Sequence, residues 1–221
     1  MILTVHRPHD KTLAQDFEDM MALADLKQTE FENLSDYIRS TDFLDAPAST
    51  RYHLCVPHGL VCHTLNGVEA ALALNSMFLL ETTSVVKVAL LHDLCKVDFY
   101  KEYHKNVKRY LSPLDYESYA SGEDKDGRFY WGKDRGYLVD EQFCYGHGEK
   151  SVLIAQSLGI NLTLLEAQAI RYHMGDFTKN PETSRVYSDN PLALLLHMAD
   201  LYASSKLDMS AEACKNINIL E

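Results

Sequence analysis

The sequence predicts an all-α fold, a helical bundle that carries one small β-hairpin insertion. Apolar residues recur at three- and four-residue steps through most of the chain, which is the pattern of amphipathic helices. Helix-start signals precede several of these segments, and one aromatic-rich segment, 98–145, breaks the helical rhythm. The length of 221 residues suits one domain, or one domain with a small appendage.

We predict three parts along the chain. Residues 1–46 form an N-terminal helical extension, 47–205 form the main domain, and 206–221 form a C-terminal tail. Apolar residues recur at helical spacing over 11–26 and again over 30–40. Both helices of the extension are therefore expected to serve as scaffold.

The main domain is expected to contain further helices with recognisable starts. A long apolar helix is predicted from Gly59 to about Leu80. Thr163 and Glu166 form a capping-box pattern that starts another helix. Pro191 is typical of the first turn of a helix, with the preceding Asp189 or Asn190 as its cap.

The insertion 98–145 has a different character. Short aromatic runs at 129–131 and 137–139, separated by a polar, glycine-containing segment at 132–136, fit a short β-hairpin. Such an insertion could act as a lid or as the contact of a homodimer, and its composition does not choose between these roles.

Charge and composition exclude several classes of protein. The net charge of −11 argues against a broad basic face for long nucleic acid, although a local basic pocket stays compatible with it. No apolar run approaches the roughly 18 residues of a membrane span, and the N-terminus lacks a signal-peptide pattern, so no membrane partner is expected. The five cysteines are odd in number and show no C-x-x-C spacing, which favours reduced thiols and a cytoplasmic location.

The chemistry of the chain is organised around the apolar stretch 85–96, which carries His92 and Asp93 side by side. A carboxylate buried among apolar residues is costly unless it is paired or bound to a metal. Taken alone, this pair is best interpreted as a hydrogen bond in the core.

The same arrangement recurs elsewhere in the chain. His63 lies on the apolar stripe of its helix, and Asp200 lies deep in the apolar segment 192–200. His147 opens a helix between two glycines, and His173 comes just before a helix-ending glycine. Each has an ordinary structural explanation, but together they need partners, and a shared metal centre supplies them.

The predicted ligands are four imidazoles and two carboxylates: His63, His92, Asp93, His147, His173 and Asp200. One catalytic ion usually takes three or four protein ligands, so six ligands predict two divalent ions, with Asp93 as the natural bridge. Nitrogen and oxygen ligands suit Mn, Fe, Co, Ni or Zn and do not choose among them.

The order H…HD…H…H…D resembles that of the HD-domain superfamily of metal-dependent phosphohydrolases. The matching segments are Gly59–Thr64 with His63, Leu91–Lys96 with His92 and Asp93, and His197–Asp200 with Asp200. Two further segments, Gly146–Ser151 and Tyr172–Gly175, resemble those that supply the additional ligands of the two-metal branch. The resemblance covers roughly 47–205.

Two details qualify this resemblance. The lead-in from Pro47 to Gly59 is similar to the HD part of bacterial 3′-5′ exoribonucleases, but this chain has no length for their added OB domain. Cys95 stands where the family usually has glycine, and we expect it to alter packing more than chemistry.

The resemblance implies an all-helical bundle that hydrolyses a phosphate ester, commonly of a nucleotide or related small molecule, by a metal-bound hydroxide. Asp93 and Lys96 are the candidate catalytic residues. Lys96 is also the main candidate for binding substrate phosphate, with Arg51 and His53 as weaker ones. The alternative for Lys96 is a solvated lysine favoured by the helix dipole. The expected partner is a small phosphorylated substrate rather than long nucleic acid.

Two other functions fit the same ligands. Some two-metal members of the superfamily are di-iron oxygenases that cleave C–C or C–P bonds, and others could bind a nucleotide or another ligand without catalysis. The sequence shows no Walker-type loop, no dinucleotide-binding glycine pattern and no nucleophile elbow, so competing enzyme classes lack their motifs.

Overall fold

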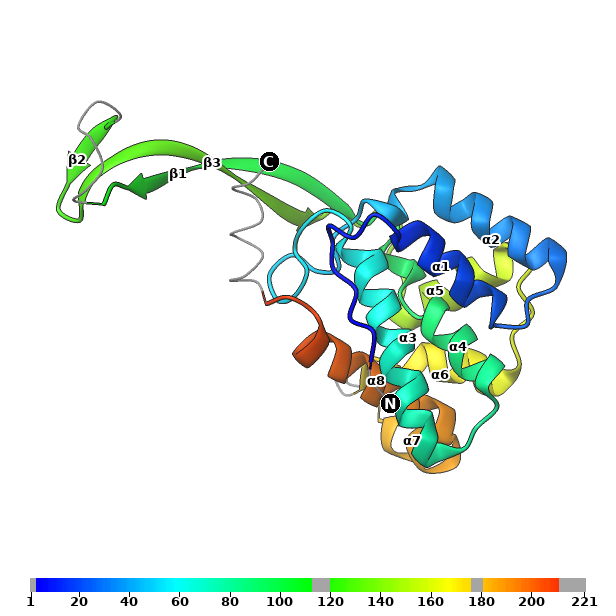
Figure 1. Cartoon of the computed structure of the whole chain (residues 1–221). Helices are drawn as coiled ribbons and strands as arrows, with labels where there is room; N and C mark the ends of the chain where they lie inside the picture. The colour runs from blue at the N-terminus through cyan, green and yellow to red at the C-terminus, as the bar shows by residue number, and fades with distance from the viewer. Residues whose placement is uncertain (1–2, 113–119, 176–180, 211–221) are drawn as a thin grey trace.

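The computed structural model describes residues 3–112, 120–175 and 181–210. In these ranges a helical body carries an arm of paired strands that extends away from it (Figure 1). The α-helices of the described residues are α1 (Leu13–Ala22), α2 (Gln28–Ser40), α3 (Gly59–Phe78), α4 (Thr82–Leu91), α5 (His147–Ser157), α6 (Leu164–Tyr172), α7 (Thr183–Asp189) and α8 (Pro191–Tyr202).

Short helical turns lie between these helices and help to shape the site. They are η1 (Asp42–Leu44), η2 (Leu94–Lys96) directly after α4, and the π-helical turn η5 (Ala203–Leu207) directly after α8. Within the described part of the chain, no helix has both the length and the apolar character to cross a membrane.

Local sequence signals decide where several helices begin. The Thr163 hydroxyl accepts a hydrogen bond from the Glu166 N–H, and the Glu166 carboxylate accepts one from the Thr163 N–H, so the predicted capping box is confirmed. Asn190, the second of the two predicted caps, accepts a hydrogen bond from the Leu192 N–H at the start of α8. These contacts satisfy N–H groups that have no partner inside the helix.

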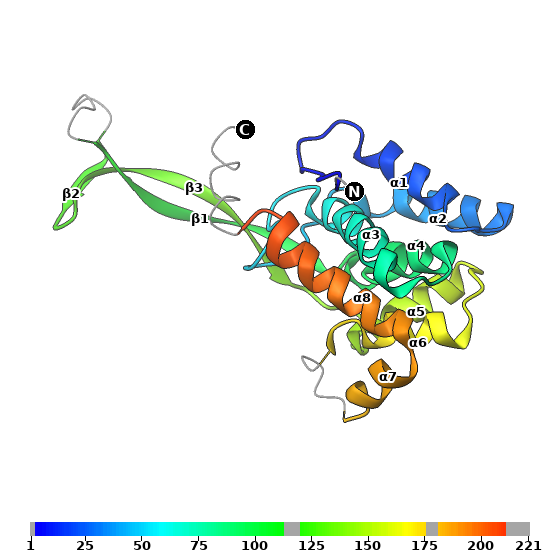
Figure 2. The same ribbon diagram turned by 60° about the horizontal axis from the view of Figure 1, so that its bottom comes forward.

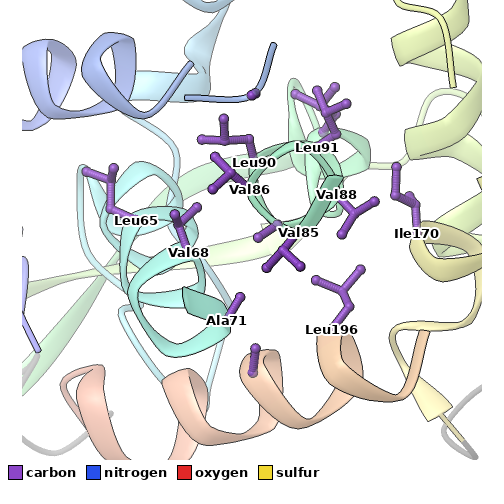
Figure 3. Packing of buried hydrophobic residues seen from close by; sticks show 14 of the residues in the cluster. Leu65, Val68, Ala71, Val85, Val86, Val88, Leu90, Leu91, Ile170 and Leu196 are labelled. Atoms are coloured by element: carbon purple, nitrogen blue, oxygen red, sulfur yellow. The ribbon is translucent and has the colours of Figure 1, made fainter. Parts of the chain in front are cut away.

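Helix α4 occupies the centre of the body (Figure 3). Val85, Val88 and Leu90 are almost completely buried, and side chains of α3, α6 and α8 pack around them. A helix that is apolar on every side is expected to be buried in this way. Each such side chain contributes about 1.5–3 kcal/mol through its burial, so α4 is a firm support for the residues that follow it.

The N-terminal helices share this core. Phe17 of α1 and Leu34 of α2 are fully buried in the same apolar cluster as α4. Phe17 also packs edge-on against Phe43 of η1, with ring centroids 5.1 Å apart. The described part, 3–46, of the predicted N-terminal extension 1–46 therefore packs as part of the helical body (Figure 2).

The prediction of an all-α fold is wrong, because the structure contains a three-stranded antiparallel sheet. Its strands are β1 (Tyr100–Tyr110), β2 (Gly122–Asp124) and β3 (Gly127–Val139), in the order β1-β3-β2. The fold is a mixed helix-and-strand fold. The sequence predicted only a short hairpin here. Its segment mixes polar and aromatic residues without a long apolar run, and such a pattern gives little indication of strands of this length.

The predicted hairpin turn at 132–136 is also wrong, since these residues lie inside the continuous strand β3. Gly132 and Gly136 face cross-strand neighbours instead: a Cβ atom at Gly132 would come within 2.6 Å of Arg109 Nε, and one at Gly136 within 2.7 Å of Tyr103 Cζ. The glycine with the left-handed backbone of a turn is Gly127, at φ +123°. Gly132 and Gly136 thus admit large side chains from β1 and do not reverse the chain.

The arm leaves the body at Tyr100 and Val139 and reaches well beyond the helices in both views (Figures 1 and 2). Trp131 and Tyr110 keep about half of their surface exposed, at 55% and 46%. The predicted roles of this insertion, a lid or a homodimer contact, stay predictions.

Candidate metal centre

The six predicted ligands, which are separated by up to 137 residues of sequence, meet at one end of the body. His63 comes from α3, His92 and Asp93 from the turn after α4, and His147 from the first position of α5. His173 follows the last residue of α6, and Asp200 lies near the end of α8. Because these residues lie at or near helix ends, their side chains can meet at one point of the body.

Asp93 is the centre of this cluster. Its Oδ2 atom lies 3.3 Å from His63 Nε2 and 3.4 Å from His92 Nε2. Its Oδ1 atom lies 3.0 Å from His147 Nε2 and 3.8 Å from His173 Nε2. Asp200 Oδ1 lies 3.2 Å from His63 Nε2 and completes the Oδ2 side. The two carboxylate oxygens thus face different sets of imidazoles, as a carboxylate that bridges two ions would.

The turn that carries Asp93 is held by Ser151 of α5, which sequence analysis did not identify. The Ser151 hydroxyl donates to the His92 carbonyl at 2.6 Å and accepts from the Cys95 N–H at 3.0 Å. Ser151 is completely buried. A single hydroxyl therefore fixes the backbone on both sides of Asp93.

Two of the histidines are held in the form that binds metal. His92 Nδ1 lies 2.7 Å from the Ala89 carbonyl oxygen, and His173 Nδ1 lies 2.6 Å from that of Ile170. Because a carbonyl oxygen only accepts, each Nδ1 carries the hydrogen and each Nε2 keeps its lone pair. Burial lowers the pKa of both rings, and for His173, with His92 and His147 beside it, to about 3.

The Nε2 atoms of His92 and His173 and the Oδ2 atom of Asp93 are buried without a hydrogen-bond partner within the described residues. Asp93 Oδ2 has the Lys96 ammonium as an ion-pair partner at 2.7 Å, whereas the two imidazole nitrogens accept no hydrogen bond from any described residue. Buried polar atoms are normally paired, and a group of ligand atoms such as this one could hold a metal ion.

His63 is oriented differently, by a carboxylate. Its Nδ1 lies 2.8 Å from Asp208 Oδ2, and the Asp208 side chain is fully buried and also accepts from Asn66 Nδ2 at 2.9 Å. Burial opposes the charge on His63, but Asp208, Asp200 and Asp93 outweigh it and raise the pKa of the ring well above its usual value. Asp208 follows η5 and lies in the predicted tail, 206–221, so no helical spacing pointed to it.

Lys96 and His53 also reach the cluster. Lys96 Nζ lies 2.7 Å from Asp93 Oδ2, as an ion pair outside hydrogen-bond geometry. Burial opposes the ammonium charge, but Asp93 and Tyr100 outweigh it and raise the pKa of Lys96. His53 Nε2 lies 3.7 Å from Asp208 Oδ2, and burial, with His63 and Lys96 nearby, lowers the pKa of His53 to about 4.

A cavity of about 440 Å³ opens onto the centre and is called here the Lys96 cavity. Its lining residues are Tyr52, His53, Asp93, Lys96, His173, Met174, His197, Asp200, Leu201, Ser204 and Ser205. Arg51 is exposed and is not among them, so its predicted role in substrate binding stays a prediction. A larger cavity of about 560 Å³ lies beside α1 and contains none of the predicted ligands.

Cys95 has a chemical partner that the sequence did not reveal. Its Sγ atom lies 3.3 Å from His147 Nδ1 and 3.4 Å from His147 Nε2. Burial opposes the charge on His147, but Cys95 and Asp93 outweigh it and raise the pKa of His147 to about 10. The expectation that Cys95 alters packing more than chemistry does not account for this contact.

The arrangement could hold metal. Among the described residues, four groups of three side chains place one ligand atom each within 4.8 Å of one another: His53, His63 and Asp208; His63, His92 and Asp93; His92, His173 and Asp200; and Asp93, Cys95 and His147. Every group contains predicted ligands, and the groups overlap because His63, His92 and Asp93 each belong to two of them. A centre with more than one ion is compatible with this overlap.

No protein-family model, no curated protein and no solved structure matches this chain. The resemblance to the HD-domain superfamily therefore rests on the motif residues alone.

Proposed function

We propose that this chain is a metal-dependent phosphohydrolase or phosphodiesterase of the HD-domain type, acting on a nucleotide or a related small phosphate ester. One observation carries the proposal: the six residues selected from the sequence lie together, with the four histidines 3.0–3.8 Å from the carboxylate oxygens of Asp93 and with His92 Nε2 and His173 Nε2 lacking a hydrogen-bond partner among the described residues. Two divalent ions bound there would activate a water for attack on phosphorus and neutralise charge on the phosphoryl oxygens.

The protein groups around the ions have separable tasks. Asp93 would offer one carboxylate oxygen to each half of the centre, since Oδ2 faces His63 and Oδ1 faces His147. The carbonyls of Ala89 and Ile170 hold the His92 and His173 rings, so that their lone pairs need no reorientation when metal binds. Asp208 does the same for His63.

Lys96 is the candidate phosphate-binding residue. Its side chain is only 11% exposed, lines the Lys96 cavity and stays protonated, because Asp93 and Tyr100 raise its pKa against the effect of burial. A phosphate oxygen entering the cavity would meet this ammonium beside the ions. His53 is neutral at physiological pH and can donate or accept a hydrogen bond at the same wall.

The proposed substrate is small. A cavity of about 440 Å³ falls within the usual range of roughly 300–1,000 Å³ for small-molecule sites. The net charge of −11 would repel a long nucleic acid outside the local basic site. The four described cysteines are free thiols, and they support a cytoplasmic location as part of the proposal.

The first test is elemental analysis of protein purified without chelator, followed by assays on nucleotides and a generic phosphodiester with Mn, Co, Ni or Zn added. We expect about two ions per chain and phosphate release that a chelator stops. Two irons with turnover only in oxygen would replace the proposal with the oxygenase alternative. Metal-loaded protein that binds nucleotide without turnover would replace it with the ligand-binding alternative, and failure to bind metal would refute the site.

A further inference from the structure

We infer that Cys95 is a metal ligand, so that the half of the centre containing His147 carries a sulfur donor. The inference deepens the proposed function and rests on it, since it assigns the ligands of one of the two proposed ions. It predicts that this half prefers a thiophilic ion such as Zn²⁺ or Fe²⁺ over Mn²⁺ or Mg²⁺. The other half keeps nitrogen and oxygen donors only.

One distance matches that between two ligands of a single ion. Zinc binds sulfur at about 2.3 Å and imidazole nitrogen at about 2.0–2.1 Å, so two tetrahedral ligands of these types lie about 3.5 Å apart. Cys95 Sγ and His147 Nε2 are 3.4 Å apart. His147 Nε2 is in turn 3.0 Å from Asp93 Oδ1, and the three residues place ligand atoms within 4.8 Å of one another.

A hydrogen bond from Cys95 to His147 is the competing explanation. Such a bond is directed at the lone pair of one ring nitrogen, whereas Sγ is almost equidistant from both, at 3.3 and 3.4 Å. The His147 ring therefore lies beside the sulfur without receiving its hydrogen along one clear direction. The sulfur is likewise not ahead of the Nε2 lone pair, so shared coordination requires a turn of the His147 ring, whose side chain is 25% exposed.

The backbone places the sulfur rigidly. Cys95 is 2% exposed and lies in η2, where its N–H donates to the buried Ser151 hydroxyl. The same hydroxyl donates to the His92 carbonyl, so the turn that presents Asp93 also presents Cys95. A ligand held in this way loses little freedom when metal binds.

The two sides of Asp93 differ in donor type. His63, His92 and Asp200 surround Oδ2 and offer nitrogen and oxygen. His147 and Cys95 lie on the Oδ1 side and add sulfur. Because sulfur ligands favour softer ions, one chain could hold two ions of different preference. The thiol proton passes to solvent when the metal–sulfur bond forms.

The test uses full-length protein stripped of metal and titrated with Co²⁺, because a cobalt–thiolate bond gives an intense near-ultraviolet charge-transfer band. We expect this band in the native protein and in Cys62→Ser, and its loss in Cys95→Ser. Cys62 is a matched control, since it is also buried but donates its thiol hydrogen to the His6 carbonyl at 3.0 Å. A band of full strength in a folded Cys95→Ser protein would overturn the inference.

Zn²⁺ affinity gives a second readout of the same variants. Loss of a partner that only orients a ligand costs about 10–100-fold in metal affinity. We expect Cys95→Ser to weaken one of the two Zn²⁺ sites by more than about 100-fold, and to change Mn²⁺ affinity less. Equal losses for Zn²⁺ and Mn²⁺ would contradict a ligand role.

A measurement on the native protein covers the case in which Cys95→Ser does not fold. X-ray absorption of the Zn²⁺-loaded chain should show a sulfur shell at about 2.3 Å beside nitrogen and oxygen at about 2.0–2.1 Å. A spectrum with nitrogen and oxygen alone would refute the inference while leaving the two-metal proposal intact. A chain that binds no metal at all would refute both.

Discussion

Asp93 and Glu166 are two carboxylates of the same helical body, and both side chains are only 2% exposed. Glu166 is fully paired by protein: Oε1 accepts from the Ser84 hydroxyl at 2.9 Å and lies 3.1 Å from Lys87 Nζ, while Oε2 accepts from the Thr163 N–H at 2.8 Å. Glu166 lies in the first turn of α6, where the Thr163 N–H, the Ser84 hydroxyl and Lys87 all point to its carboxylate.

Asp93 has more neighbours but fewer bonds. Four imidazoles and one ammonium surround it, yet most of these contacts measure 3.3–3.8 Å, and Oδ2 has no hydrogen-bond partner within the described residues. The two carboxylates are therefore equally buried but differ in how completely the protein pairs them. Glu166 stabilises the fold through complete pairing, whereas Asp93 leaves ligand atoms at distances that an ion between them would close.

The largest expected effect is the loss of metal and activity on substitution of Asp93, which the same test at Glu166 should not produce. Asp93→Ala should reduce metal content from about two ions per chain to none and abolish activity, because it removes the bridge between both halves of the centre. Elemental analysis and phosphate release measure this outcome. Glu166→Gln is the control and should keep its metal; full activity in Asp93→Ala would remove Asp93 from the site.

Glu166→Ala should reverse this result and affect the fold. It leaves the Thr163 N–H, the Ser84 hydroxyl and Lys87 without their acceptor, so the free energy of unfolding should fall by about 3 kcal/mol. Chemical denaturation of the metal-free proteins measures the change. Glu182→Ala is the comparison, because Glu182 is an exposed carboxylate just before α7, where it accepts a hydrogen bond from the Tyr172 hydroxyl. Unchanged stability in Glu166→Ala would mean that complete pairing contributes nothing here.

Lys96→Ala tests whether the ammonium beside Asp93 serves the substrate or the metal. We expect metal content to stay at the native level while kcat/KM falls about 100-fold, because the charge that binds the substrate phosphate is lost. Lys206→Ala is the matched control, since Lys206 is an exposed lysine that does not line the Lys96 cavity. Native kinetics in Lys96→Ala would exclude Lys96 from the site.

Asp208→Asn should have a smaller effect on metal. The amide keeps the size of the side chain but lacks the charge that supports His63, so metal affinity should fall about 10–100-fold without abolishing binding. Competition with a chromogenic chelator measures this loss. If the metal affinity of Asp208→Asn equals that of the native protein, the 2.8 Å contact between Asp208 and His63 only holds the chain segment after η5 in place.

The smallest effect concerns pH. Burial opposes the charge on Glu166, but the Thr163 N–H, the Ser84 hydroxyl and Lys87 outweigh it and hold the pKa of Glu166 below its usual value. The stabilisation is therefore complete above the unfolded-state pKa of about 4.3 and is lost as pH falls through the lower folded-state pKa. The stability difference between native protein and Glu166→Ala should be constant above about pH 6 and shrink below about pH 4. A difference that grows on acidification would contradict this sign.

The helices, and the six residues that the structure brings together around Asp93, could be selected from the sequence, because their signals are local. Helical spacing of apolar residues marks α3, α4 and α8, and a cap such as Thr163 acts within four residues. A histidine or carboxylate such as Asp200 within an apolar helix is unusual enough to be noticed without knowledge of its neighbours.

What the sequence could not determine depends on contacts between distant segments. Gly132 and Gly136 looked like turn residues, and only the pairing of β3 with β1 shows that they make room for Arg109 and Tyr103. Asp208 reaches His63 across 145 residues, so no spacing rule links them.

Cys95 is the clearest case of what tertiary structure decided. Its position in the motif was visible in the sequence, but its contact with His147 exists only because α5 packs against η2 and Ser151 joins the two. Local periodicity determines which residues are buried in helices. The meeting of those residues, and therefore the chemistry of the site, is decided by how the helix ends pack together.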